Sequence, residues 1–284
     1  MRFLTCFFGL SLLIPAQADD AAIRKAVTFY VSYDESTVAD VGGGERKFYT
    51  RSNDAKEKGK YVYEKGYDAK VFDINKKGIQ GGCLAATDVL QNNGRIYYPA
   101  QGNIGFKKEG WAGALSVWMN TDPNKLLKTK FCDPIQITQK GANNGGLWFD
   151  FNDAKPRDLR HGAFTAVSEN EKPLSEDGAN APMVRVPKIE LKQGEWHHVV
   201  LSWKNFDTGK NDAVSQLWID GKLLGEVKER AIAMKWDIDK AGIYVAINYI
   251  GLLDELALFN RDLTEAEIKE LHKTPSLLTG LKKK

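Results

Sequence analysis

The sequence has few of the residues that build catalytic and metal centres. Its 284 residues include only four histidines and three cysteines. No CxxC pair or other zinc-ligand spacing occurs. A glycine-rich phosphate loop and a Ser/His/Asp nucleophile signature are also missing. The sequence therefore offers no motif for zinc, nucleotide or serine-hydrolase chemistry.

An excess of charge of either sign is lacking too. The chain carries 40 basic and 37 acidic residues, a formal net charge of +3. Because nucleic-acid binding needs a concentrated basic face, this balance gives no reason to expect a nucleic-acid partner.

Long apolar runs are confined to the start of the chain, "MRFLTCFFGLSLLIPAQA". Residues 1–18 have the basic start, short apolar run and small-residue end of a secretory signal peptide, with cleavage expected after Ala18. The run is too short to span a bilayer, and no later segment is apolar enough. We therefore expect no membrane insertion, and a protein that is secreted, periplasmic or at the cell surface.

Two cysteines remain after cleavage, Cys83 and Cys132. Export permits a disulfide between them, which in the chain-entropy model would stabilise the fold by about 4 kcal/mol. Two separately buried thiols are the alternative, and the sequence leaves both open.

Short, strand-like runs recur between Gly, Asn, Asp and Pro, as in "AVTFYVS", "GALSVWMN", "GLWFDF" and "GIYVAI". This spacing predicts an all-β protein, an antiparallel β-sandwich. In "VSQLWIDGKLLGEV", Asp220 and Gly221 suit a type I′ turn and predict a β-hairpin. Because the pattern continues without a break in composition, we expect one domain over residues 19–276, followed by a basic tail at 277–284.

A short C-terminal helix is predicted over residues 265–272. Thr264 and Glu267 form a capping box, and Leu263 and Ile268 have the spacing of a hydrophobic staple.

Two adjacent histidines, His197 and His198, stand in "GEWHHVVLSW". On a strand, neighbouring side chains point to opposite faces, so the pair cannot jointly hold one metal ion. We interpret this segment as a strand buried between two layers, with one histidine hydrogen-bonded inside.

Several segments carry a family resemblance. "GEWHHVVLSW", "QLWIDGKLLGEV" and "IGLLDELALFNRDLTEAEIKELH" follow one another as in the closing half of laminin-G-like domains, and "VTFYVSYDES" and "GALSVWMNTDPN" resemble earlier strands. The chain thus resembles a laminin-G-like jelly roll of the concanavalin A-like lectin/glucanase superfamily. The resemblance also implies calcium as a cofactor, bound by Asp34 and Asp254, against the alternative of turn-forming carboxylates.

Enzymatic motifs of this superfamily are weak here. A Glu-x-Asp-x-Glu strand, which would supply a hydrolase with its two carboxylates, does not occur, and Asp150, Glu64 and Asp68 lack its spacing. A lyase could draw on groups that a solvated, mixed-charge turn would also explain: Arg157, Arg160 and His161, with Tyr97 or Tyr98 as base.

Sugar-binding surfaces combine exposed rings with planar polar groups. Trp236, Phe206, Asn143 and Asn144 lie in turn-rich segments and are candidates for such contacts, although Trp236 could equally plug the end of the sandwich. We expect a secreted, non-catalytic recognition domain that binds a polysaccharide or glycoprotein. The alternatives are a polysaccharide-acting hydrolase or lyase, and an adhesion or structural domain that binds another protein.

Overall fold

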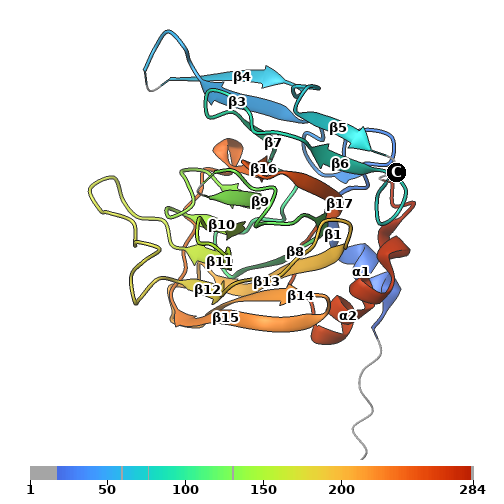
Figure 1. Ribbon diagram of the computed structural model, residues 1–284. Coiled ribbons are helices and arrows are strands. Elements are labelled where there is room, and N and C mark those ends of the chain that lie inside the picture. The colour runs from blue at the N-terminus through green and yellow to red at the C-terminus, as the bar shows by residue number, and fades with distance from the viewer. Residues whose placement is uncertain (1–17, 59, 76, 130, 283–284) are drawn as a thin grey trace, which may run out of the picture.

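The computed structural model describes residues 18–58, 60–75, 77–129 and 131–282. The expected signal peptide, except for Ala18, lies outside the described residues. Within them the chain forms two antiparallel sheets packed face to face (Figure 1), which confirms the all-β sandwich. The helices of these residues are too short or too polar to cross a membrane.

The first sheet has the strand order β15-β14-β13-β8-β17-β1-β2, and β6 links β5 to β17. Its strands are β1 (Val27–Val31), β2 (Val41–Gly42), β5 (Phe72–Asn75), β6 (Cys83–Ala86), β8 (Trp111–Asn120), β13 (His197–Phe206), β14 (Ala213–Ile219), β15 (Lys222–Arg230) and β17 (Gly251–Phe259).

The second sheet has the order β12-β11-β10-β9-β16-β7-β3-β4. Its strands are β3 (Tyr49–Asn53), β4 (Tyr61–Lys65), β7 (Arg95–Pro99), β9 (Cys132–Thr138), β10 (Gly146–Phe151), β11 (Leu159–Phe164), β12 (Met183–Val186) and β16 (Gly242–Ile247). A short 3-10 turn, η1 (Ile238–Lys240), precedes β16.

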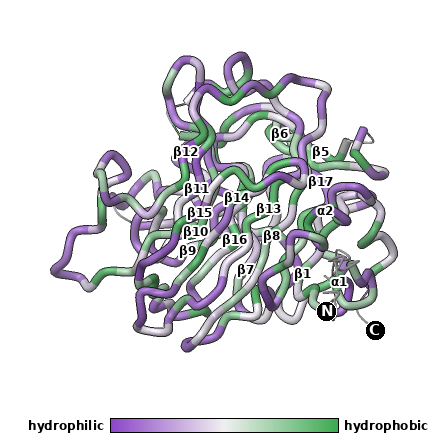
Figure 2. Tube along the Cα trace, turned by 90° about the horizontal axis from the view of Figure 1, so that it is seen from below, coloured by the Kyte–Doolittle hydropathy of each residue, from purple (hydrophilic) through white to green (hydrophobic). Residues whose placement is uncertain are grey.

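The main core lies between the two sheets. The inward residues of the second sheet are aliphatic or aromatic, for example Ile135, Phe149 and Ile243, and they pack on inward residues of the first sheet. Because side chains alternate along a strand, the residues between them face away from the core. Figure 2 shows the resulting alternation of hydrophobic and hydrophilic residues along the strands.

Helical segments cover the outer face of the first sheet. These segments are α1 (Asp20–Ala26), α2 (Glu265–Lys273) and η2 (Pro275–Leu278), and Figure 1 shows the two α-helices beside this sheet. They form a second apolar cluster with strand residues such as Val200 and Trp218.

The capping box of α2 is present as predicted, since Thr264 Oγ1 accepts a hydrogen bond from the amide of Glu267, and Glu267 caps the amide of Thr264. Two differences from expectation concern this layer. Helix α1 was missed, because seven residues are too few to show a helical period. Leu277 and Leu278, assigned to the tail, are buried against the helices.

The hairpin and the two adjacent histidines of the first sheet agree with what the sequence predicts. Asp220 and Gly221 have φ of 50° and 73° and connect β14 to β15, which confirms the hairpin. His198 is buried, and its Nε2 lies 2.8 Å from Ser116 Oγ, whereas the Nδ1 of His197 lies 2.8 Å from an oxygen of Asp220. The histidines thus serve packing and turn formation.

Cys83 and Cys132 are free, buried thiols. They lie on β6 and β9, which belong to different sheets. Of the two alternatives that the sequence left open, the structure has the separate thiols, so the proposed disulfide is absent.

Candidate functional site

The outer face of the second sheet carries two rows of side chains that run across the strands. The first row is set by direct cross-strand pairing and consists of Trp148, Gln136, Tyr244, Tyr97 and Tyr49. The ring centre of Tyr97 lies 5.3 Å from that of Tyr244 and 5.9 Å from that of Tyr49. Three tyrosines from three neighbouring strands therefore make one continuous aromatic surface.

Trp148 closes one end of this aromatic row. Its ring lies over Gly162 on β11, where a Cβ atom would come within 2.3 Å of the ring, so the close approach requires glycine. The indole Nε1 donates to the carbonyl of Ala142 at 2.9 Å, and the side chain is almost fully buried. The loop before β10 thus forms a wall beside the row.

The second row is charged. It consists of Arg160, Asp150, Asp133, Arg95 and Arg51, from β11, β10, β9, β7 and β3. Asp150 pairs with Arg160, and Arg95 pairs with Arg51, in the registers of their strands. Polar and ionic groups therefore run beside the aromatic row.

A cavity of about 610 Å³, which we call the outer cavity, opens over most of the charged row and over the Trp148–Gln136 end of the aromatic row. A second cavity of about 410 Å³ continues along the same face and shares Arg51, Tyr61, Gln139 and Lys140 with it. Two aromatic rings at the rim, Tyr61 and Phe131, are 47% and 43% exposed. The cavity therefore combines exposed rings with buried polar groups, a combination found in ligand pockets.

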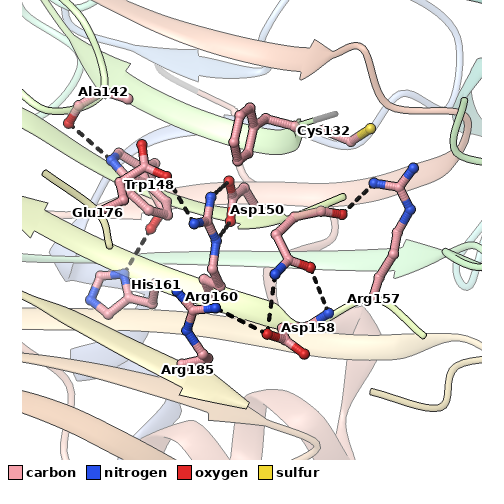
Figure 3. Close-up of polar contacts among 12 residues, drawn as sticks. Cys132, Ala142, Trp148, Asp150, Arg157, Asp158, Arg160, His161, Glu176 and Arg185 are labelled. Carbon is pink, nitrogen blue, oxygen red and sulfur yellow. Dashed lines mark hydrogen bonds and ion pairs between the residues drawn. The ribbon is translucent and has the colours of Figure 1, made fainter. Parts of the chain in front are cut away.

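Arg160 organises one end of the outer cavity (Figure 3). Its Nε donates to Asp150 Oδ1 at 2.8 Å, its Nη2 contacts Asp150 Oδ2, and its Nη1 lies 2.8 Å from Glu176 Oε2. The guanidinium also lies 5.1 Å from the ring centre of Phe131. Both carboxylates are thus held by one buried arginine.

Two carboxyl groups of this end titrate far from their ordinary range. Burial raises the pKa of Asp150 to about 6, although its bonds to Arg160 oppose the rise. Burial, and next the charge of Asp150, raise the pKa of Asp133 well above its usual value. Burial thus disfavours the charged form of both carboxyl groups at this end of the cavity.

Arg51 and Arg95 occupy the other end. The guanidinium of Arg51 lies 4.5 Å from the ring centre of Tyr61 and 5.1 Å from that of Tyr244, and it donates to Tyr244 Oη at 3.0 Å. The Nε atoms of both arginines are buried without a hydrogen-bond partner among the described residues. Burial, and next the charge of Arg51, lower the pKa of Arg95.

The structure brings together three residues that the sequence analysis named for enzymatic chemistry. Asp150 lines the outer cavity, Arg160 binds Asp150, and Tyr97 lines the neighbouring cavity. Arg157 does not line the outer cavity, and its Nη2 donates to the carbonyls of Leu127 and Thr129.

His161 is buried on the inward side of β11. Its ring nitrogens lie 2.8 Å from the Trp148 carbonyl oxygen and from Ser215 Oγ, and burial lowers its pKa to about 4. Glu64 and Asp68 also lie apart from the outer cavity. The lyase grouping of Arg157, Arg160 and His161 is therefore not assembled.

The residues predicted to contact sugar in the turn-rich segments lie outside the outer cavity. Trp236 is 4% exposed, packs on Trp111 and donates to the Gly145 carbonyl, so it plugs the sandwich end. Phe206 is fully buried.

The two asparagines are half-buried in the loop before β10. Asn144 accepts a hydrogen bond from the amide of Val167, and the Oδ1 of Asn143 is buried without a partner among the described residues. Neither asparagine lines the outer cavity.

Asp34 and Asp254 flank one loop, residues 78–82. The amide of Gly82 donates to Asp34 Oδ1 at 2.9 Å, and the amide of Gln80 donates to Asp254 Oδ2 at 3.2 Å. Burial raises the pKa of Asp254 to about 8, and Asp34 adds to the rise. In the described part of the chain no third His, Cys, Asp or Glu joins them in a metal-binding group.

Sequence reasoning missed most of the outer cavity. Arg51, Arg95, Tyr61, Tyr244 and Phe131 were not singled out. A signal existed in the strand period, because "YTR", "YVY" and "RIY" each place two Tyr or Arg side chains two residues apart on one face. Turn-rich loops were given more weight than strand faces.

Comparisons with known proteins concern the fold. No family model matches the sequence, and no curated protein matches it. Among solved structures, the chain is similar to domain 4 of AbnA, a GH43 extracellular arabinanase from Geobacillus stearothermophilus, solved with arabinotriose. The identity is 16%, the TM-score is 0.50, and 87% of this chain and 98% of that chain are covered.

Two toxin domains are also similar. The receptor binding domain of botulinum neurotoxin C/D mosaic serotype has 11% identity and a TM-score of 0.55, over 88% of this chain and 51% of that one. The binding domain of Paraclostridial Mosquitocidal Protein 1 has 12% identity and a TM-score of 0.53, over 89% and 53%. The chain spans about half of each toxin domain. At such identities the likeness shows the β-sandwich fold alone.

Proposed function

We propose that this protein is an exported, non-catalytic recognition domain that binds a polysaccharide or the glycan of a glycoprotein in the outer cavity. We also propose that it is a laminin-G-like jelly roll. The observation that carries the proposal is the pair of rows on the second sheet, aromatic and charged, under a cavity with two exposed rings at its rim.

The chemistry of this surface suits a sugar chain. Sugar rings present apolar C–H faces, which pack on aromatic rings, and hydroxyl groups, which need planar hydrogen-bonding partners. Tyr61 and Phe131 offer the rings, and Arg51, Arg95 and Gln136 offer the polar groups. Since the two cavities adjoin, an extended chain can lie along them across the strands.

The test is a binding screen of the purified protein on immobilised polysaccharides and glycans, followed by calorimetry on each chain that binds. We expect the Y61A/F131A double variant to bind about 30-fold more weakly, since each ring contributes about 1 kcal/mol. Leu223→Ala is the matched control, because Leu223 is 44% exposed on β15 of the other sheet. Absence of binding to every polysaccharide and glycan in the screen would refute the proposal and favour the adhesion alternative.

A polysaccharide-acting enzyme is the second candidate, because Asp133 and Asp150 share one cavity and both have raised pKa values. A protonated Asp133 could serve as general acid. The bidentate contact of Arg160 with Asp150 argues against a free nucleophile there. Release of reducing ends or unsaturated products that Asp133→Asn abolishes would establish the enzyme, whereas binding without product release would exclude it.

We also propose that Asp34 and Asp254 hold one structural calcium ion together with backbone carbonyls and water. The two carboxylates flank one loop, and the charge of Asp34 adds to the cost of ionising Asp254. A divalent cation would relieve that cost. We expect chelation to lower the melting temperature of the parent and to leave that of Asp254→Asn unchanged; an equal response of both would refute the site.

A further inference from the structure

The outer cavity holds two arginines in an unusual electrostatic position. Arg51 and Arg95 pair directly across β3 and β7, so two guanidinium groups face the same space. Like charges on neighbouring strands destabilise a sheet unless a counter-charge lies between them. The identity of that counter-charge decides what the cavity binds.

The protein's own carboxylates do not supply it. Asp150 and Glu176 are held by Arg160 at the opposite end. Asp133 is the acidic group of the row whose charge acts on Arg95, but among the described residues no hydrogen bond or ion pair joins it to either arginine. Among the described residues, neither Arg51 nor Arg95 forms an ion pair, and the Nε of each is buried without a hydrogen-bond partner.

The surroundings restrict the anion that would fit. The rings of Tyr61 and Tyr244 both lie against the Arg51 guanidinium, and Tyr97 pairs with Tyr244. The charged end therefore adjoins rings on which a sugar can pack, and a planar carboxylate matches the fork of a guanidinium.

We propose that the outer cavity is selective for acidic polysaccharides, and that Arg51 and Arg95 bind the anionic group of one sugar unit. This inference rests on the proposed function and names its ligand class. Carboxylated and sulfated sugars share the required charge, and the carboxylate of a uronic acid has the better geometry for two guanidinium groups.

The experiment is calorimetry of the purified protein with matched chains. Polygalacturonate and its methyl ester share a backbone and differ in charge, chondroitin sulfate and its desulfated form test the sulfate, and arabinan serves as a neutral chain. We expect polygalacturonate to bind at least tenfold more tightly than its ester. Arg95→Gln and Arg51→Gln should each weaken that binding about 10- to 100-fold and remove the preference.

The control is Lys222→Gln, which removes one positive charge from exposed β15 of the other sheet and should leave binding unchanged. Arg95→Lys keeps the charge without the fork and should restore part of the affinity. Melting curves of every variant verify folding. Preference for the sulfated over the desulfated chain, lost in Arg95→Gln, would support the same site with sulfate as the anion.

Two results separate this inference from the proposed function. Binding of a neutral chain as tight as that of the acidic chains, or acidic binding unaffected by either arginine variant, would overturn the arginine site and leave the recognition domain standing. Failure of every chain to bind would overturn both.

Discussion

The outer faces of the two sheets differ, because helices cover one of them and leave the other open. On the first sheet, α1, α2 and η2 bury an apolar cluster that includes Ile268 and Leu271. On the second sheet, no α-helix of the described residues covers the outer face, and that face carries tyrosines, arginines and carboxylates beside open cavities. The same architecture thus has one outer face covered by helices and one outer face that is open.

The difference shows where stability and function can be separated. Apolar burial on the covered face stabilises the fold without any need for specific charges. The open face holds buried charges, whose desolvation is costly unless every charge is paired. Substitutions on each face should therefore differ in what they change, and four predictions follow in order of expected effect.

Arg160→Met should give the largest loss. It would leave Asp150 buried without its guanidinium partner, and breaking such a pair costs about 3–5 kcal/mol. Urea unfolding measures the free-energy change. Arg185→Met is the control, because the pair of Arg185 with Asp158 is partly exposed and should contribute under about 1 kcal/mol. Equal losses in the two variants would contradict a stabilising role for the buried network.

Ile268→Ala should cost about 3 kcal/mol, because Ile268 is fully buried in the covered cluster and its truncation leaves a cavity. The loss should appear in urea unfolding and not in binding at the outer cavity, measured by calorimetry at a temperature where the variant is folded. Reduced affinity in the folded variant would show that the two faces are coupled.

The pH dependence of stability should distinguish the buried carboxyl groups of the first sheet from Asp150 on the second sheet. Burial raises the pKa of Asp254 to about 8 and of Glu255 to about 9, so the folded protein retains protons that the unfolded chain releases near pH 4. The free energy of unfolding should therefore fall as pH rises, by up to about 1.4 kcal/mol per pH unit for each group.

Buried His161 and His198 act in the opposite sense below pH about 6.5, because burial lowers their pKa values to about 4 and about 3. The fall should thus be visible from pH 6.5 to 8.5, in urea titrations with chelator present. Asp254→Asn should make it shallower, with Glu255 still contributing, and Asp150→Asn should leave it unchanged, because the pKa of Asp150 is only about 6. Stability that increases over this range would contradict the assignment.

Thr264→Ala should have the smallest effect, about 1 kcal/mol, because it removes the side-chain cap of α2. Thermal unfolding measures it, with Glu265→Ala as the control in the same helical turn. Loss of the cap should leave the outer cavity unchanged. An unchanged melting temperature would show that packing of Ile268 alone holds the helix.

Local sequence patterns predicted the elements that depend on a few neighbouring residues. The Asp220–Gly221 hairpin and the Thr264 capping box are of this kind, and both are present. The sandwich itself followed from the recurrence of short strands. Exposure did not follow, since turn-rich sequence surrounds both Trp236 and Phe206 and yet both rings are buried.

The outer cavity could be predicted only in pieces. Asp150, Arg160 and Tyr97 were recognised separately as groups with chemical potential, but the rows depend on strand pairings that are distant in sequence, such as Tyr97 with Tyr244. No short-range pattern specifies which strands become neighbours. The alternation of Tyr and Arg within single strands was visible, but the face they share appears only once the sheet is assembled.

Alkylation of the two buried thiols can report when the two layers of the sandwich separate. Cys83 and Cys132 sit on opposite sheets, and burial raises the pKa of Cys83 to about 12 and also raises that of Cys132. Because alkylating reagents attack the exposed thiolate, each cysteine should react only when its own layer separates from the other. Timed labelling followed by peptide mass analysis would show whether the layers part together or in sequence.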